Sequence, residues 1–444
     1  MSLKLVNRCL NAGVGGPYGK ADGHLLIPIP GGEVTQPKLR RIIVFPESVK
    51  SIRDANGTAI RIQVRRLISS ALNARCRRAR PPSPRTIPMT TLPSRLPLIQ
   101  APMVGSSSPL AIAVCKAGGL GSLACAALGP QQLRDEIAAI RAHTPAPFNV
   151  NFFCHTPPAP DAEVDARWRA ALAGYYAEAG LDPADVKGGP GRAPFDDAMC
   201  AVVEALRPAV VSFHFGLPDD ALLERVRRTG AWVVSSATTV EEARWLDARG
   251  VDAIVAQGAE AGGHRGMFLT DDIHAQPGLF ALLPQIVDAV RVPVIAAGAI
   301  ADGRGIAAAF ALGACAVQIG TGYLLTPQAG RSAQHRAAVR AARDDGTRMT
   351  NLYTGRPARG LLTRFMREQG PMSALAPAFP LATAAVEPLR SAFERQGRDD
   401  FSLLWSGEAA ALACEADAGE LTQRLWRDAL ACAAGLRDAF PQAA

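Results

Sequence analysis

A single histidine follows a run of residues that is typical of a buried strand. In the stretch VVSFHFGLP, residues 210–218, apolar residues lead to His214, and a Gly-Leu-Pro turn follows one residue later. An imidazole titrates near pH 6.5, so at neutral pH it can accept a proton as a base or stabilise an anion as imidazolium. A histidine in this position can also be a hydrogen-bonded core residue. We take His214 as the candidate catalytic residue and leave its protonation state open.

Glycines are concentrated in three other segments, each of which follows an apolar run. The segments are AQGAEAGGHRG (256–266), AAGAIADGRG (296–305) and QIGTGYL (318–324). Glycine lets backbone N–H groups approach an anion closely, and Asp302 can cap a helix that begins in the second segment. Ordinary turns between strands and helices also use glycine. Three such segments together nevertheless predict a site for the phosphate of a cofactor or substrate.

A regular series of strands and helices must position these residues. Eight short apolar runs alternate with helix-like segments, and we predict strands at 97–103, 120–126, 148–154, 209–215, 232–237, 252–258, 292–298 and 315–321. Strands that are apolar on both faces indicate a buried parallel sheet. Eight strand–helix units in about 230 residues predict an α/β fold of the (β/α)8 TIM-barrel type. The alternative is a doubly wound open sheet, but the Gly-x-Gly-x-x-Gly fingerprint is absent after the first strand.

In such a barrel the active site lies at the carboxyl ends of the strands. This rule places Met103 and His214 at the same end as the three glycine-rich segments. Asn149 and Asn151 lie in the third strand, and we expect only one of them to face the interior.

Two further histidines are expected to have no part in the chemistry. His264 has Gly263 and Arg265 as neighbours, so we expect it to steady the phosphate loop or to face solvent. His155 follows the third strand and is expected at the surface.

The chain divides into two unlike parts. Of 48 Lys and Arg and 40 Asp and Glu, residues 1–88 hold 16 and 4, so this part is basic and the remainder mildly acidic. Residues 1–88 lack a sustained hydrophobic period, and we predict a disordered extension or sequence outside the functional protein. A transit peptide and a nucleic-acid-binding arm are the alternatives. The barrel is expected over residues 89–326, and a mostly helical substrate-binding lid over residues 327–444, with loops at 354–360 and 401–407.

Composition also excludes several classes of protein. No apolar run approaches the ~18–20 residues that span a membrane. The nine cysteines form no Cys-x-x-Cys pair, so no zinc or iron–sulfur site and no other metal is predicted. Scattered single cysteines are typical of a reducing cytoplasm. We expect a cytoplasmic monomer or homodimer that binds neither nucleic acid nor membrane.

Several segments resemble the nitronate monooxygenase family, formerly called 2-nitropropane dioxygenases. They are PLIQAPMVGSSSPLAIAVCKAGGLGSL, VVSFHFGLP, VDAIVAQGAEAGGHRG and VPVIAAGAIADGRGIAAAFALGACAVQIGTGYL. The resemblance extends from about Leu92 to the C-terminus and leaves residues 1–88 uncovered. Its glycine motifs are long and specific, although flavin-dependent enoyl-ACP reductases share them. The histidine in SFHFG matches the class I nitronate monooxygenases, in which this residue is catalytic.

The resemblance implies a TIM barrel that binds FMN without a covalent bond. The family's FMN contacts carry over to Met103, Asn151, Gln257, Gly262, Gly263, Gly298, Gln318, Ile319, Gly320 and Thr321. The family often has Gly-Gly after the seventh strand, where this chain has Gly298-Ala299, so Ala299 would have to supply the second N–H. The C-terminal region implies Tyr323, Tyr353 and Ser406 as substrate-pocket candidates. Phe401 and Trp405 are expected to be packing residues.

The resemblance also implies the activity. Family members oxidise alkyl nitronates such as the toxic propionate 3-nitronate, with FMN and O2, to a carbonyl compound and nitrite, which suggests a detoxifying role. The partners would then be a small nitronate or nitroalkane and O2. A neutral nitroalkane carries an acidic C–H beside the nitro group, and His214 would remove this proton or hold the nitronate oxygens as imidazolium. The alternative activity is an FMN-dependent NAD(P)H reductase of the enoyl-ACP or quinone type on the same fold.

Overall fold

The computed structural model describes residues 52–53, 59–60, 92–185 and 192–439. The chain forms two units, residues 1–85 and 86–444. In the first unit only β1 (Ile52–Arg53) and β2 (Ala59–Ile60) are described, and they pair antiparallel. The predicted disorder of residues 1–88 otherwise lies outside the described residues. Within the described part of the chain, no helix has the length and apolar character needed to cross a membrane.

Eight parallel strands form the centre of the second unit, as predicted for a TIM barrel. They are β3 (Leu98–Gln100), β4 (Gly121–Ala124), β5 (Phe148–Phe153), β6 (Val210–His214), β7 (Trp232–Ala237), β8 (Ala253–Gln257), β10 (Val294–Ala297) and β11 (Ala316–Ile319). Their order in the sheet is β3-β11-β10-β8-β7-β6-β5-β4. A parallel bridge between Ile99 and Leu120 then joins β3 to β4 and closes the barrel. All eight predicted strands are therefore confirmed.

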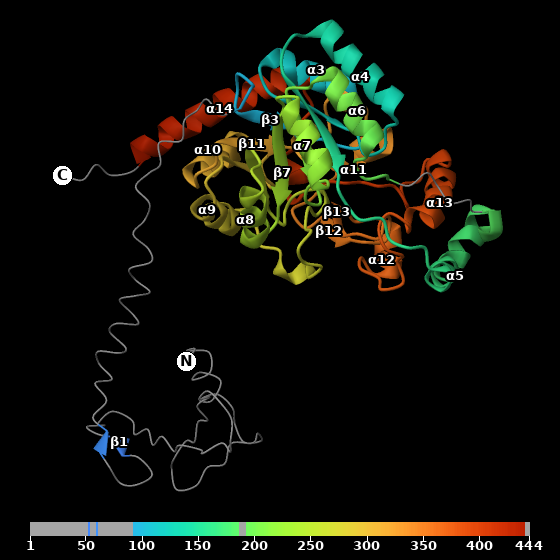
Figure 1. The fold of residues 1–444 in the computed structure, drawn as a ribbon. Helices are drawn as coiled ribbons and strands as arrows, with labels where there is room; N and C mark the ends of the chain where they lie inside the picture. Colours follow the sequence, from blue (N-terminus) through green and yellow to red (C-terminus); the bar gives the residue numbers. More distant parts are fainter. Residues whose placement is uncertain (1–51, 54–58, 61–91, 186–191, 440–444) are drawn as a thin grey trace. The chain divides into compact units, whose positions relative to one another are not determined.

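Helices surround this barrel and bury their apolar faces against it. They are α3 (Ser108–Ala117), α4 (Pro130–His143), α6 (Asp197–Leu206), α7 (Asp220–Arg228), α8 (Val240–Ala248), α9 (Leu279–Ala289), α10 (Gly303–Ala311) and α14 (Ala418–Ala439). Asp302 caps α10 as expected, because its side chain accepts hydrogen bonds from the N–H groups of Arg304 and Gly305. The last helix, α14, packs against α10 and α3, so this helix completes the outer layer of the barrel (Figure 1).

The remaining elements lie at the carboxyl ends of the barrel strands. They are α5 (Ala162–Ala179), β9 (Gly263–His264), α11 (Ala333–Arg340), β12 (Thr347–Thr350), β13 (Ala358–Leu361), α12 (Arg364–Gln369), α13 (Thr383–Arg395) and five short 3-10 turns at 183–185, 273–275, 321–323, 327–329 and 408–412. Strands β12, β13 and β9 form a small antiparallel sheet. The region after residue 326 is thus mostly helical, but β13 occupies part of the segment where we expected only a loop.

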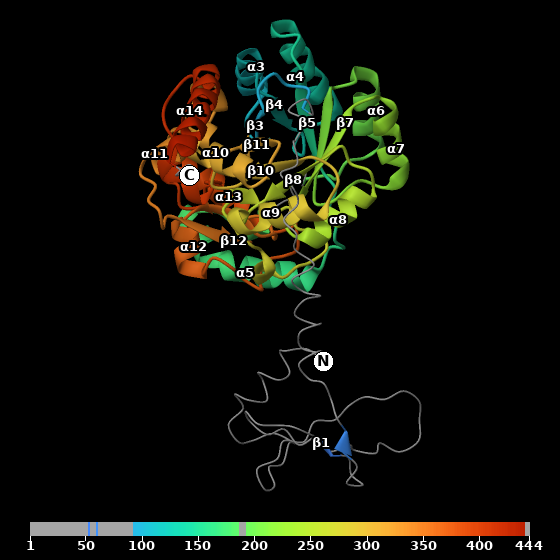
Figure 2. The same cartoon turned by 90° about the vertical axis from the view of Figure 1, so that its left-hand side faces the viewer.

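We call α5 together with residues 347–407 the cap. The cap has a core of its own, and its main members are Trp168, Leu172, Tyr175, Tyr176, Leu352, Tyr353, Phe365, Met366, Leu389, Phe393 and Phe401. The hydroxyl of Tyr176 in α5 donates to the carbonyl of Ala385 in α13 at 2.6 Å, across 209 positions of sequence. Figures 1 and 2 both show α5 beside the C-terminal elements of the cap. Helix α5, which lies between β5 and α6 in the sequence, is therefore part of the cap.

Candidate active site

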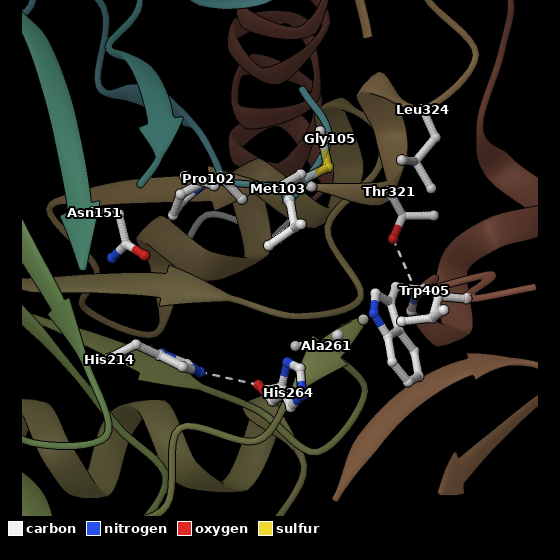
Figure 3. Close-up of a pocket in the computed structure, with 18 of the residues that line it drawn as sticks. Pro102, Met103, Gly105, Asn151, His214, Ala261, His264, Thr321, Leu324 and Trp405 are labelled. Carbon is white, nitrogen blue, oxygen red and sulfur yellow. Dashed lines mark hydrogen bonds between the residues drawn. The ribbon is translucent and has the colours of Figure 1, made fainter. Parts of the chain in front are cut away.

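One cavity of about 480 Å³ lies between the barrel and the cap. Ten of the fourteen predicted site residues line it: Met103, Asn151, His214, Gln257, Gly262, Gly263, Gly298, Gln318, Gly320 and Thr321. Figure 3 shows Met103, Asn151, His214, Thr321 and Trp405 arranged around this space. The volume is typical of a small-molecule site. The histidine of the fourth barrel strand and the glycine turns of the last three therefore open onto one cavity, as the sequence predicted.

Two hydrogen bonds hold the ring of His214. Its Nε2 lies 3.1 Å from the backbone carbonyl oxygen of His264, and its Nδ1 lies 3.1 Å from Ser236 Oγ. A carbonyl oxygen can only accept a hydrogen bond, so Nε2 carries a hydrogen in both protonation states of the ring. The neutral ring is therefore the Nε2–H tautomer, and Nδ1 is its basic nitrogen.

The side chain of Gln257 holds the carbonyl that fixes this tautomer. Its Oε1 accepts from the N–H of Gly266 at 2.7 Å, and its Nε2 donates to the His264 carbonyl at 3.0 Å. The carbonyl thus accepts from both Gln257 and His214, which matches its two lone pairs. Gly266 must also stay a glycine, because a Cβ there would lie 2.9 Å from Cε1 of His214.

Burial keeps His214 neutral. It lowers the pKa of His214 to about 4, and the positive charges of Arg356 and Arg265 act in the same direction. The hydrogen bond to the His264 carbonyl opposes this shift. At neutral pH the ring is therefore uncharged and Nδ1 carries no proton, which favours the role of a base over that of an imidazolium.

The backbone after His214 is strained. Phe215 has φ of 69° and Gly216 has φ of 92°, both in the left-handed region. A bulky residue in this region costs about 1–3 kcal/mol and commonly marks a functional site. Here the conformation turns the chain sharply after the histidine, and the Phe215 ring stacks under the guanidinium of Arg356, 4.1 Å from its centroid.

The loop after β10 forms a cradle for an anion. Gly298 has φ of 122° and Ala299 has φ of 52°, so both residues are left-handed. In the described residues, the backbone N–H groups of Ala299, Ile300 and Thr321 find no hydrogen-bond acceptor, and all three residues line the cavity. Such a cluster of unpaired N–H groups binds anions. Ala299 therefore adopts the conformation that the usual glycine would take, at a cost of about 1–2 kcal/mol.

Both asparagines of β5 face the barrel interior, so the prediction that only one would do so was wrong. The Nδ2 atoms of Asn149 and Asn151 donate to the same oxygen, Ser212 Oγ, at 2.9 and 2.8 Å. Residues two apart on a strand lie on the same face, so both must point inward. Asn151 lines the cavity, and Asn149 lies deeper in the barrel.

Two histidines that we expected outside the chemistry are buried beside His214. His264 does not face solvent: it is 8% exposed, lines the cavity and contacts Thr354 Oγ1 through Nε2 at 2.9 Å. His155 is not at the surface either: it is 5% exposed and packs edge-on against Phe379. Burial lowers the pKa of His155 to about 4 and holds that of His264 well below its ordinary value. The cap covers both rings, and no residue pattern near either histidine indicates this contact.

The three substrate-pocket candidates do not line the cavity. The hydroxyl of Tyr323 pairs with Thr422 Oγ1 of α14 at 2.8 Å, and that of Tyr353 pairs with Thr363 Oγ1 at 2.6 Å. Ser406 is fully buried under the cavity wall, and its Oγ has no hydrogen-bond partner in the described part of the chain. Ile319 alternates with the cavity-lining Gln318, and its side chain packs in the layer between the barrel strands and the surrounding helices, so only its backbone is available to a ligand.

Several residues that sequence analysis missed also line the cavity, and all but Ser236 of β7 lie outside the barrel strands. They include Arg192, Ser236, Arg331, His335, Thr383, Glu387, Arg390 and Trp405. Trp405 was expected to be a packing residue and is instead part of the cavity wall, whereas Phe401 packs in the cap core as expected. Arg192 is notable because its NH1 atom is buried without a partner among the described residues. No cluster of His, Cys, Asp or Glu suited to a metal ion occurs in the residues that the structure describes.

Comparison with known proteins supports a single family. A family model described as nitronate monooxygenase matches residues 87–428. A nitronate monooxygenase of Paraburkholderia phytofirmans is 42% identical over 336 residues, which are 75% of this chain and 92% of that protein. A solved nitroalkane oxidase from Streptomyces ansochromogenes is 40% identical, with a TM-score of 0.72, and covers 79% of this chain and 100% of its own. FabK from Thermotoga maritima is 26% identical with a TM-score of 0.57, covering 78% and 96%.

Proposed function

The chain belongs to the nitronate monooxygenase family, and on that premise we propose that it oxidises alkyl nitronates, with FMN and O2, to a carbonyl compound and nitrite. One observation carries the proposal: a partly buried, neutral histidine lines the same cavity as a set of backbone N–H groups that are unpaired among the described residues. The first suits proton removal beside a nitro group, and the second suits a cofactor phosphate.

The family implies a flavin, and the anion cradle supports the proposal that this flavin is FMN, which carries one phosphate. The N–H groups of Ala299, Ile300 and Thr321 would hold its single phosphate at the barrel end of the cavity. Met103 and Asn151 line the same cavity and would contact the rest of the cofactor. Since Asn151 uses its Nδ2 on Ser212, its Oδ1 is left to accept a hydrogen bond. When bound, FMN supplies the electron-accepting chemistry and the reaction with O2.

The chain's own residues supply proton transfer and orientation. With a neutral nitroalkane, the carbon beside the nitro group loses a proton, Nδ1 of His214 gains one, and the negative charge moves onto the nitro oxygens. The imidazolium that forms keeps its Nε2–H on the carbonyl of His264. With a nitronate supplied as the anion, this step is not needed. Trp405 and Leu404 of the cap help to exclude water from the cavity.

The substrate end of the cavity is charged, which fits a small polar substrate such as propionate 3-nitronate. Arg192 contributes a guanidinium whose NH1 has no partner among the described residues, and the neighbouring Arg390 is paired with Glu387. The positive charge of Arg192 also lowers the pKa of His264 and of His155, so the Arg192 guanidinium lies close to these two rings.

The test combines absorbance and product analysis on the full chain loaded with FMN. Under anaerobic conditions the flavin absorbance should bleach with propionate 3-nitronate and not with NAD(P)H, and addition of O2 should yield nitrite. Rapid bleaching with NAD(P)H, and none with nitronate, would instead establish the reductase alternative. The identities of 42% and 40% to proteins named for nitronate or nitroalkane oxidation, against 26% to FabK, favour the first outcome.

A variant pair then tests the histidine. His214→Asn should keep its bound FMN spectrum and lose about 10²–10⁴-fold in turnover of neutral nitroalkanes, because the general base is gone. His143→Asn is the matched control, since His143 is exposed at the end of α4. Unchanged nitroalkane turnover in His214→Asn would remove this residue from the catalytic role.

A further inference from the structure

Access to the basic nitrogen of His214 is restricted. Nε2 is committed to the carbonyl of His264, which leaves Nδ1 to accept a proton. An imidazole nitrogen has a single in-plane lone pair, and that of Nδ1 is engaged by Ser236 Oγ at 3.1 Å. Since the neutral Nδ1 has no hydrogen, the Ser236 hydroxyl must be the donor in this contact. A substrate that approaches Nδ1 of His214 therefore contacts Ser236 Oγ first.

The surroundings of Ser236 suit it to pass a proton on. Ser236 is 7% exposed and lines the cavity, so its hydroxyl faces both the ring and the ligand space. Among the described residues, Ser236 Oγ makes no hydrogen bond other than that to His214. Its remaining lone pair is therefore open to the cavity.

The ring cannot easily turn to present Nδ1 directly. Gly266 packs against both groups: a Cβ on it would lie 2.9 Å from Cε1 of His214 and 3.1 Å from Cβ of Ser236. The strained Phe215 fixes the backbone on the other side of His214. The Nε2–H bond to the His264 carbonyl would also have to break, and Gln257 holds that carbonyl in place.

We propose that Ser236 is a catalytic residue that relays the substrate proton to Nδ1 of His214. The C–H bond of the nitroalkane breaks as an O–H bond forms on Ser236 Oγ. The original Oγ–H bond breaks as an N–H bond forms on Nδ1, and the electron pair of the C–H bond moves onto the nitro group. The step ends with a nitronate anion, an imidazolium and an intact serine hydroxyl. This inference rests on the proposed function and adds to it the residue and the atom that handle the proton.

The experiment compares two substrates in one enzyme. Nitroethane needs proton removal, whereas ethyl nitronate, supplied as the anion, does not. In FMN-loaded Ser236→Ala, the ratio of nitroethane to nitronate turnover should fall about 100-fold, within the range for general-base catalysis. Ser236→Thr keeps a hydroxyl on the same carbon and should recover most of this ratio. Nitrogen-15 NMR of the His214 ring should show the Nε2–H tautomer in both variants, which separates a relay from a lost ring orientation.

Three results would overturn the relay. The first is an unchanged substrate ratio in Ser236→Ala. The second is an equal loss with both substrates, together with a changed ring tautomer, which would make Ser236 a structural residue. The third is a wild-type enzyme that turns over nitronate and never nitroethane. Failure of the wild type on nitronate itself would instead overturn the proposed function, so the two failures are distinguishable.

Discussion

The two walls of the cavity are built in different ways. On the barrel side, each ligand-facing residue lies within a few positions of a strand end, as His214 does at the end of β6 and Gly298 just after β10. On the cap side, the wall draws on α13, on the segment around Trp405 and on Arg192, which precedes α6. The barrel wall follows from the order of strands, whereas the cap wall requires segments far apart in sequence to pack together.

The two walls also differ in their chemistry. The barrel side offers unpaired backbone N–H groups, amides and a neutral histidine. The cap side offers guanidinium and carboxylate groups such as Arg390 and Glu387. The backbone N–H groups and amides of the barrel side suit a cofactor that the whole family shares. The charged side chains of the cap side suit a substrate that can vary within the family. We call the contact between the barrel and the cap the seam. Changes in the barrel loops should affect flavin retention, and changes at the seam should affect the free energy of unfolding.

The largest effect is expected where the two walls touch. A Cβ at Gly262 would lie 2.5 Å from the N of Gly407 and 2.6 Å from the C of Ser406, and neither backbone atom can move aside. Gly262→Ala should cost about 3 kcal/mol in the free energy of unfolding and give colourless protein. Gly263→Ala is the matched control, because its Cβ would meet nothing and only its φ of 73° costs about 1 kcal/mol. Urea unfolding and the visible spectrum measure both. Equal effects at the two positions would mean that the seam is not tightly packed.

The second-largest effect is expected at acid pH, where protonation of His155 should lower the free energy of unfolding. The pKa of His155 lies at about 4 in the folded chain and near 6.5 in the unfolded chain, so the unfolded state binds more protons between these values. Its contribution is complete above pH 6.5 and is lost as the pH falls toward 4, by up to about 3 kcal/mol. His155→Phe should reduce this loss, because the ring packs among aromatics and both its nitrogens lack partners in the described residues. Urea unfolding at pH 7 and pH 5 measures it, with exposed His143→Phe as the control. An identical pH dependence in His155→Phe would contradict the low pKa.

The smallest effect is expected inside the barrel loop. Ala299→Gly removes a left-handed strain of about 1–2 kcal/mol and adds about 0.5–1 kcal/mol of unfolded-state entropy, so a net gain below about 1 kcal/mol is expected. Ala308→Gly in α10 has no strain to relieve and should instead lose about 1 kcal/mol. Thermal unfolding of the flavin-free chain measures both. A destabilised Ala299→Gly would show that the methyl group packs more favourably than its φ costs.

Much of the barrel side could be predicted because its signals are local. Apolar runs gave the eight strands, and glycine clusters after β8, β10 and β11 indicated the anion cradle. The errors have a common cause. His155, His264 and Trp405 were misplaced because the cap that covers them is assembled from distant segments. Tyr323 and Tyr353 were placed in the cavity by resemblance, and the structure instead pairs each with a threonine.

The sequence by itself determined the barrel and the position of His214 at the carboxyl end of its strands, because strand order and hydrophobic pattern are properties of neighbouring residues. Only the tertiary structure decided the protonation state of His214 and the contacts of its two nitrogens. The pKa of an imidazole depends on how completely other parts of the chain exclude water from it. The tautomer depends on which acceptor reaches which nitrogen, and here that acceptor is a backbone carbonyl 50 residues further along the chain.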